Sequence, residues 1–373
     1  MPSGHSRRRA DRALRRLSGP DASVGALPSR APDARPLVTR PTSRRLGALV
    51  ALALSAAALL AACGGGSAPS ATARAAAQRD PAAPAASASA AVTSCTPRPG
   101  RTLDGPGPFA VQRVHGPLAR PVAGSSTSRR IDPTMWFPTA AATAAARGCQ
   151  WRLILLSHGV ASSPDRYARL ARCTASQGFV VLGPHHPDGD SRGFDEGSER
   201  VDDLSYLLDH LALVEQRLAP RLRGRIDGQA VGVAGHSFGA FSAAALTARD
   251  PRVKAAMIMA GGADPSTAAA IRVPTLAVAG GADPLVSVER VRGFADSIPP
   301  STPHALAVIA GAGHVAYGNR CVQFGIGTCN TVARTASAMF LTYLAGLPGD
   351  SAPIDPGHAG PGVTITAVHM PPA

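Results

Sequence analysis

Between residues 152 and 345, short apolar runs alternate with longer amphipathic stretches, an order that few folds accommodate. Short apolar runs indicate buried strands, and apolar residues three or four positions apart indicate helices. The expected strands are 109–114, 130–137, 152–157, 179–183, 230–234, 255–260, 274–279 and 305–310. The expected helices are 163–177, 199–218, 238–249, 288–298 and 331–345. Strands that alternate with helices predict an α/β fold with a single, mostly parallel sheet flanked by helices.

An apolar segment at residues 46–62 has the length of the hydrophobic region of an export signal and follows two arginines. It ends in Leu60-Ala61-Ala62-Cys63, which is similar to the lipobox of bacterial lipoproteins. We therefore expect residues 1–62 to be an N-terminal extension with a signal peptide. Cys63 would then carry a lipid anchor on a periplasmic or extracellular membrane face. An ordinary secretory signal and a single membrane span are the alternatives.

Composition divides the rest of the chain into three parts. Residues 63–100 are rich in Ala, Ser, Pro and Gly without periodicity, which is typical of a flexible tether. Residues 101–346 carry the alternating pattern and are expected to form one domain. Residues 347–373 are again rich in Pro and Gly and are expected to be a peripheral tail.

The formal net charge of +14 does not indicate a nucleic-acid partner. Residues 1–62 contain 11 Arg and 3 Asp, so more than half of the excess lies in the segment expected to be removed. Aromatic residues make up only 4%, which disfavours binding of single-stranded nucleic acid by stacking. We expect no nucleic-acid partner and a monomer.

The chain contains six cysteines, and five remain if Cys63 is lipidated. Cys321 and Cys329 would close a short loop and are the expected disulfide. The other three, Cys95, Cys149 and Cys173, allow one further pair, and the sequence leaves that pairing open. None of the cysteines has the paired spacing of a zinc site, and no metal or organic cofactor is implied.

The segment Gly235-His236-Ser237-Phe238-Gly239 lies between an expected strand and an expected helix. This is the setting of a nucleophile elbow, in which a sharp turn lifts the serine to the edge of the sheet. A serine hydroxyl is a weak nucleophile at neutral pH, so it needs a base, and the base needs an orienting acid. We predict Ser237 as a nucleophile, and we expect His236 to shape the pocket beside it.

Candidates for the base and the acid follow later strands. His314 follows the strand 305–310 and is the predicted base, and Asp283 follows the strand 274–279 and is the predicted acid. Asp264, one strand earlier, is the alternative acid; whichever carboxylate is not used is expected to cap a turn or helix. The carboxyl ends of parallel strands share one edge of a sheet, so these side chains can meet Ser237 there.

Acyl transfer also needs donors for the oxyanion that develops on the reacting carbonyl. We expect the backbone N–H groups of Val160 and Phe238 to supply them. His158, in the same loop as Val160, is expected to form structural hydrogen bonds.

Together these motifs resemble the dienelactone-hydrolase-like superfamily of α/β-hydrolases. This group includes platelet-activating-factor acetylhydrolase-like proteins and bacterial cutinase-like polyester hydrolases. The resemblance covers about residues 105–344. It rests on the serine elbow and on Gly107-Pro108-Phe109, Ser157-His158-Gly159, Gly178-Phe179-Val180-Val181, Gly224-Arg225-Ile226-Asp227, Val273-Pro274-Thr275-Leu276 and Ala312-Gly313-His314. It implies an α/β-hydrolase catalytic domain that cleaves carboxylic esters through an acyl-enzyme.

The resemblance also bears on the substrate. Enzymes named for dienelactone use a cysteine nucleophile, so that substrate is not expected here. Polyester hydrolases of this group place aromatic residues around the cleft, where this chain has Val160 and Gly261-Gly262. We expect small-molecule esters with short- to medium-chain acyl groups. Aliphatic polymers, lipase-like substrates, acyl transfer or peptide hydrolysis on the same residues, and non-catalytic surface binding are the alternatives. The short connection 261–273 predicts that no large lid covers the site.

Overall fold

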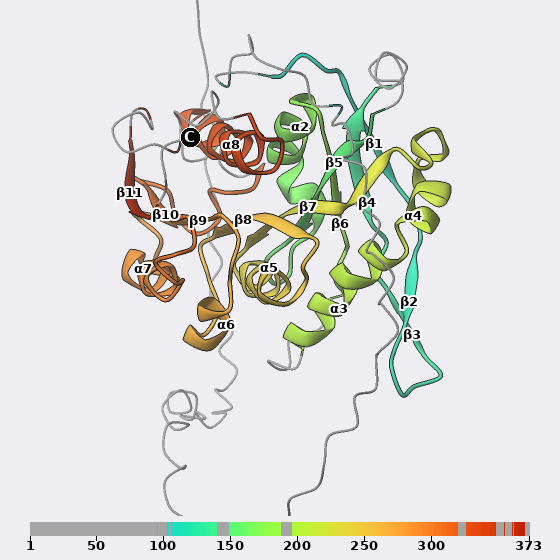
Figure 1. Cartoon of the computed structure of the whole chain (residues 1–373), viewed down its shortest axis with the longest axis horizontal. Coiled ribbons are helices and arrows are strands. Elements are labelled where there is room, and N and C mark those ends of the chain that lie inside the picture. Colours follow the sequence, from blue (N-terminus) through green and yellow to red (C-terminus); the bar gives the residue numbers. More distant parts are fainter. Residues whose placement is uncertain are drawn as a thin grey trace, which may run out of the picture. The chain divides into compact units, whose positions relative to one another are not determined.

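A nine-stranded sheet lies at the centre of the structure, a computed structural model (Figure 1). Across the sheet the strands are β1 (Val111–His115), β4 (Thr134–Pro138), β6 (Phe179–Gly183), β5 (Trp151–Ser157), β7 (Ile226–His236), β8 (Val253–Met259), β9 (Thr275–Gly280), β10 (His304–Ile309) and β11 (Val363–His369). The six strands from β6 to β10 run parallel. The strands β1, β4 and β11 pair antiparallel with their neighbours. The predicted single, mostly parallel sheet is confirmed.

The structure describes residues 95, 103, 106–139, 149–187, 196–319, 326–347, 354, 360 and 362–369. They belong to one unit, which begins at Pro84. Its helices are η1 (Pro164–Tyr167), α2 (Ala168–Ser176), α3 (Glu196–Asp209), α4 (Leu211–Leu218), η2 (Pro220–Leu222), α5 (Phe238–Arg249), α6 (Pro265–Ala269), α7 (Val288–Asp296) and α8 (Ile326–Tyr343). None of these described helices is long and apolar enough to cross a membrane.

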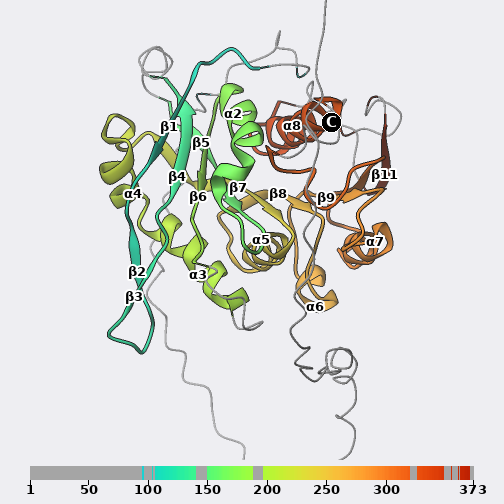
Figure 2. The same ribbon diagram turned by 180° about the vertical axis from the view of Figure 1, so that it is seen from behind.

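The helices cover the two faces of the sheet as separate layers (Figures 1 and 2). One core lies between the sheet and α3, α5 and α7, and the other between the sheet and α2 and α8. Alternate side chains of β5 enter the two cores, with Leu153 and Leu155 in the first and Ile154 and Leu156 in the second. Both faces of the central strands are therefore buried. This explains why they read as continuous apolar runs.

Two expected elements are interrupted. The strand expected at 130–137 is split into β3 (Ser128–Arg130) and β4, because Pro133 lacks a backbone donor and Asp132 instead accepts from the N–H of Leu118. β3 pairs with β2 (Ala119–Pro121) in a hairpin that extends away from the sheet (Figure 2). The helix expected at 199–218 is divided at His210 into α3 and α4.

The segment expected to be a peripheral tail, 347–373, contributes the last strand of the sheet. β11 pairs antiparallel with β10 along its whole length. Residues 363–366 are all β-branched, and their burial alternates: Ile365 is buried, whereas Thr364 and Thr366 are exposed. This short alternation is flanked by Pro and Gly, so composition alone did not reveal a strand. The expectation of a tail was wrong for this part.

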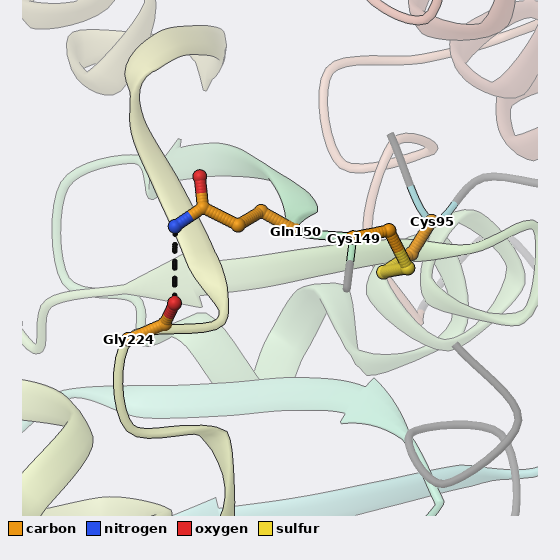
Figure 3. The surroundings of a disulfide bond; sticks show 4 residues. All are labelled: Cys95, Cys149, Gln150 and Gly224. Carbon is orange, nitrogen blue, oxygen red and sulfur yellow. Dashed lines mark hydrogen bonds between the residues drawn. A yellow bond between two sulfur atoms is a disulfide. The ribbon is translucent and has the colours of Figure 1, made fainter. Parts of the chain in front are cut away.

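A disulfide joins Cys95 to Cys149, two of the three cysteines whose pairing the sequence left open (Figure 3). The N–H of Cys95 donates to the carbonyl of Gln150 at 2.9 Å, and the Gln150 side chain donates to the carbonyl of Gly224 at 3.0 Å. Cys95 lies within the segment expected to be a tether, and the disulfide attaches this position to the start of β5. The expected pair of Cys321 with Cys329 and the expected lipidation at Cys63 lie outside the described side chains.

Candidate active site

Ser237 lies at the sharp turn between β7 and α5. Its backbone has a φ of 57° and a ψ of −120°, a conformation that a residue with a side chain rarely adopts. The N–H of Ser237 donates to the carbonyl of Met259 at 2.9 Å, which holds the turn against the end of β8. A strained serine between a parallel strand and a helix is the geometry of a nucleophile elbow.

The two glycines of the motif permit close backbone approach on both sides of this turn. A Cβ atom on Gly239 would lie 2.2 Å from the carbonyl oxygen of Ser157, at the end of the neighbouring strand β5. A Cβ atom on Gly235 would lie 2.1 Å from the carbonyl oxygen of Gly239. Both distances are far below van der Waals contact, so glycine is required at both positions.

His314 and Asp283 form a hydrogen-bonded line with Ser237. Nε2 of His314 lies 2.9 Å from Oγ of Ser237, and Nδ1 lies 2.9 Å from Oδ2 of Asp283. The other carboxylate oxygen of Asp283 accepts from the N–H groups of Leu285 and Val286 at 2.8 and 3.0 Å. The Asp283 side chain is fully buried, so water does not compete for these hydrogen bonds. This arrangement can move a proton from the serine to the imidazole.

The loops that carry Asp283 and His314 are joined through their backbones. The N–H of Ala282 donates to the carbonyl of Ala312 at 3.1 Å, and a Cβ on Gly280 would lie only 2.3 Å from that same carbonyl. The distance between the carboxylate and the imidazole is therefore set by main-chain contacts at the ends of β9 and β10.

The alternative acid, Asp264, has other partners. Its carboxylate caps α6 and accepts from the N–H groups of Ser266 and Thr267 at 2.9 and 3.0 Å, and from both hydroxyls. These hydrogen bonds, the one from the Ser266 side chain foremost, hold the pKa of Asp264 well below its usual range. The side chain that contacts His314 is thus Asp283, and Asp264 stabilises its own turn.

A pocket of about 350 Å³ lies over Ser237 and His314. Among the residues that the structure describes, the large apolar side chains that are exposed are Val160, Leu285 and Val315, and all three line this pocket. Val160 lies in the loop after β5, and Phe238 is the first residue of α5, directly after Ser237. The two expected oxyanion donors therefore belong to segments that meet at the serine turn.

A network of buried hydrogen bonds holds the loop that carries Val160. His158 donates from Nδ1 to the carbonyl of Gly159 at 2.8 Å, and its Nε2 accepts from the N–H of His186 at 3.0 Å. Burial, followed by the charge of His186, lowers the pKa of His158 to about 2, so its ring is neutral. The ring of His186 contacts Ser157 at 3.0 Å and Asp203 at 2.8 Å. These contacts fit the structural role expected for His158.

Arg200 connects the two segments that carry the expected oxyanion donors. Its side chain is fully buried, and its guanidinium donates to the carbonyl of His158 at 2.5 Å. The guanidinium carbon also lies 4.7 Å from the centre of the Phe238 ring, a cation–π contact. Sequence reasoning did not single out Arg200, because an arginine near the start of an amphipathic helix normally faces solvent.

Among the described residues, no group of three or more His, Cys, Asp or Glu side chains is arranged to hold a metal ion. The groups that meet at or beside the pocket are the Ser237 hydroxyl, the His314 imidazole and the Asp283 carboxylate.

A mostly parallel sheet with helices on both faces and a strained serine turn at the end of a central strand defines the α/β-hydrolase class. Within this class the chain belongs to the PETase family, described as PET hydrolase-like, whose model matches residues 102–330.

Curated relatives carry the name cutinase. Cutinase 1 of Thermobifida cellulosilytica is 27% identical over 164 residues, which are 44% of this chain and 60% of the relative. Cutinase est2 of Thermobifida alba is 30% identical over 164 residues, which are 44% of this chain and 52% of the relative. The chain thus spans between half and two thirds of the length of these relatives.

Proposed function

We propose that this chain is a serine hydrolase that cleaves carboxylic esters through an acyl-enzyme. The observation that carries the proposal is the hydrogen-bonded line from Ser237 through His314 to Asp283 beneath an open pocket. Membership of the PET hydrolase-like family and similarity to proteins named cutinase support the same reaction class.

In this mechanism, Ser237 Oγ attacks the ester carbonyl while Nε2 of His314 takes the hydroxyl proton. The N–H groups of Val160 and Phe238 donate to the oxyanion of the tetrahedral intermediate. His314 then gives the proton to the leaving alcohol, and the C–O bond breaks to leave an acyl group on Ser237. A water molecule gives a proton to His314 and attacks the acyl carbon. The bond between that carbon and Ser237 Oγ then breaks, His314 returns the proton to Oγ, and the acid leaves. Asp283 holds the imidazole in the required tautomer throughout.

The substrate class follows from the lining of the pocket. Val160, Leu285 and Val315 present aliphatic surface in the pocket. By the resemblance to polyester hydrolases, Gly261 and Gly262 stand where those enzymes carry an aromatic residue. Aliphatic side chains contribute apolar contact without the stacking that favours an aromatic ring. We infer that short- to medium-chain aliphatic acyl groups fit best, in small esters or at the surface of an aliphatic polyester.

The test is hydrolysis of p-nitrophenyl esters from acetate to palmitate by the wild type and by Ser237→Ala. We expect a maximum at short to medium chains and loss of turnover by a factor of at least about 10³ in the variant. Asp283→Asn should lower kcat strongly, whereas the matched variant Asp264→Asn should retain turnover. Activity that survives Ser237→Ala would exclude the proposed nucleophile, and a reversed order of the two aspartate variants would exclude Asp283 as the acid.

We further infer that the protein is exported and anchored through Cys63. The apolar segment before Cys63 supports this inference, and so does the Cys95–Cys149 disulfide, because such bonds persist mainly in oxidising compartments. Metabolic labelling with a fatty acid should mark the protein, and Cys63→Ala should abolish the label. A label that persists in this variant would place the anchor elsewhere.

A further inference from the structure

A buried tyrosine–histidine pair lies between the loop of the expected oxyanion donor and the loop of the expected base. Oη of Tyr167 lies 2.6 Å from Nδ1 of His236, and Nε2 of His236 lies 2.8 Å from the carbonyl oxygen of His314. The N–H of Gly159 donates to the same tyrosine oxygen at 3.3 Å. Tyr167 is 3% exposed and His236 is 5% exposed, so these hydrogen bonds have little competition from water.

The direction of every hydrogen bond in this series follows from one acceptor. The carbonyl of His314 can only accept, so Nε2 of His236 carries a proton. Burial, followed by the charge of His314, lowers the pKa of His236 to about 3, so the ring is neutral and its Nδ1 has no proton. Tyr167 must therefore donate to Nδ1, and a lone pair of its oxygen is left to accept from Gly159. Only this placement of the protons satisfies all three hydrogen bonds.

We propose that His236 and Tyr167 are positioning residues for the reaction. Through one continuous series of hydrogen bonds they fix the backbone of His314 and the oxyanion loop at Gly159, on either side of Ser237. This inference rests on the proposed function, because it assigns a task to residues that surround the same site.

The ring contacts of His236 support this role. Its centroid lies 5.0 Å from that of His314 and 5.0 Å from that of Tyr317, so the ring is packed between neighbours that restrict its rotation. The imidazole of His314 is held at both nitrogens by Ser237 and Asp283, and the bond from His236 adds a third point at its backbone. A displacement of about 1 Å at a reacting group can reduce the rate about 100-fold.

A competing role is direct contact with substrate, because Tyr167 and His236 both line the pocket. The two roles differ in kinetics. Loss of a substrate contact raises KM, whereas misplacement of the base and of the oxyanion donor lowers kcat and leaves KM nearly unchanged. Misplacement of these groups also lowers the affinity for a boronic acid, which reproduces the tetrahedral state, more than it lowers the affinity for substrate.

The experiment measures hydrolysis of p-nitrophenyl butyrate by the whole protein, by three single variants and by one double variant. Tyr167→Phe removes the hydroxyl and should lower kcat about 10-fold, and His236→Leu removes both ring nitrogens and should lower kcat about 100-fold. His236→Gln keeps a donor that can reach the carbonyl of His314 and should recover most of the loss. Because the residues act in one series, the double variant of Tyr167→Phe with His236→Leu should be no slower than His236→Leu alone.

Tyr206 and His210 supply the matched control, since they form a stacked pair at the end of α3 with centroids 4.0 Å apart and neither lines the pocket. Tyr206→Phe and His210→Leu should leave kcat, KM and the boronic acid affinity unchanged. Labelling of Ser237 with a fluorophosphonate, followed by mass spectrometry, counts the folded active sites in each variant, so that misfolding is not mistaken for a slow reaction.

Two results would overturn the inference. One is a rise in KM at unchanged kcat, which would make the pair a substrate contact. The other is a loss of kcat in the double variant equal to the product of the two single losses, which would show that Tyr167 and His236 do not act through one series of hydrogen bonds. Failure of the proposed function has a different signature, because Ser237→Ala would then retain the activity of the wild type. Loss of activity in Ser237→Ala with normal kcat in Tyr167→Phe and His236→Leu would refute the positioning role alone.

Discussion

A single missing carbon atom at Gly239 allows the serine turn to form. The carbonyl of Ser157 occupies the space that a Cβ would need, and the flexible end of a side chain is not available there to move aside. The serine turn, the oxyanion loop and the end of β5 are therefore packed backbone against backbone. The positive φ of Ser237 persists because these contacts surround it on several sides.

Gly239→Ala should displace this turn. We expect a loss of about 2–3 kcal/mol in the free energy of unfolding, as for other overpacked sites, together with loss of ester hydrolysis. Urea denaturation and the p-nitrophenyl assay measure the two effects. Gly293→Ala in α7 is the control, because beyond its chain neighbours and the backbone of its own helix nothing lies within 4 Å of the added Cβ. This variant should be neutral or stabilising by up to about 1 kcal/mol. Equal stability of the two variants would contradict the backbone contact at Gly239.

Among the elements, β11 shows how a segment outside the expected domain completes the fold. β10 would otherwise be an edge strand with a row of unpaired backbone groups, and such edges favour aggregation. β11 pairs with these groups and places Ile365 in the core shared with α8. His314 follows the end of β10, so the pairing of β11 with β10 also holds the strand that positions this imidazole.

Ile365→Ala should destabilise the protein by about 2–4 kcal/mol, because it leaves a cavity in that core. Thr364→Ala removes a smaller side chain from the adjacent, exposed position and should cost less than about 1 kcal/mol. Thermal melting of both variants gives the comparison. If Thr364→Ala were the more destabilising of the two, the assigned face of β11 would be wrong.

At the scale of the whole molecule, two buried neutral histidines couple folding to pH. Burial, followed by the charge of a neighbouring histidine, lowers the pKa of His158 to about 2 and that of His236 to about 3. Below pH of about 6.5 the unfolded chain binds protons at these imidazoles and the folded protein does not. The stability that they contribute is therefore fully present above that pH and is lost as the pH falls toward 3.

Between pH 6.5 and pH 5 we expect the two imidazoles together to reduce the free energy of unfolding by up to about 4 kcal/mol. Urea denaturation at a series of pH values measures this slope. His158→Gln should make the slope shallower by about half, whereas His210→Gln, on the exposed surface, should leave it as in the wild type. A slope that is the same in all three proteins would show that folding does not lower the pKa of His158.

The alternation of apolar runs and amphipathic stretches was sufficient to predict the sheet and its helical layers, because these patterns are local and repeat along the chain. The elbow was equally accessible, since Gly235, Ser237 and Gly239 are neighbours whose spacing reflects a single turn. The position of His314 after a strand also followed from chain order. These features depend on residues that lie close together in sequence or on the regular geometry of a parallel sheet.

Other features required contacts between distant residues. His314 contacts Asp283 while Asp264 caps its own helix, and both carboxylates follow strands that end at the same edge of the sheet. Tyr167 reaches His236 across 69 positions, and Cys95 reaches Cys149 across 54. No local pattern encodes such pairs, because a hydrogen bond or a disulfide depends on the separation of two groups in space. That separation is set only when the strands, turns and helices have packed together.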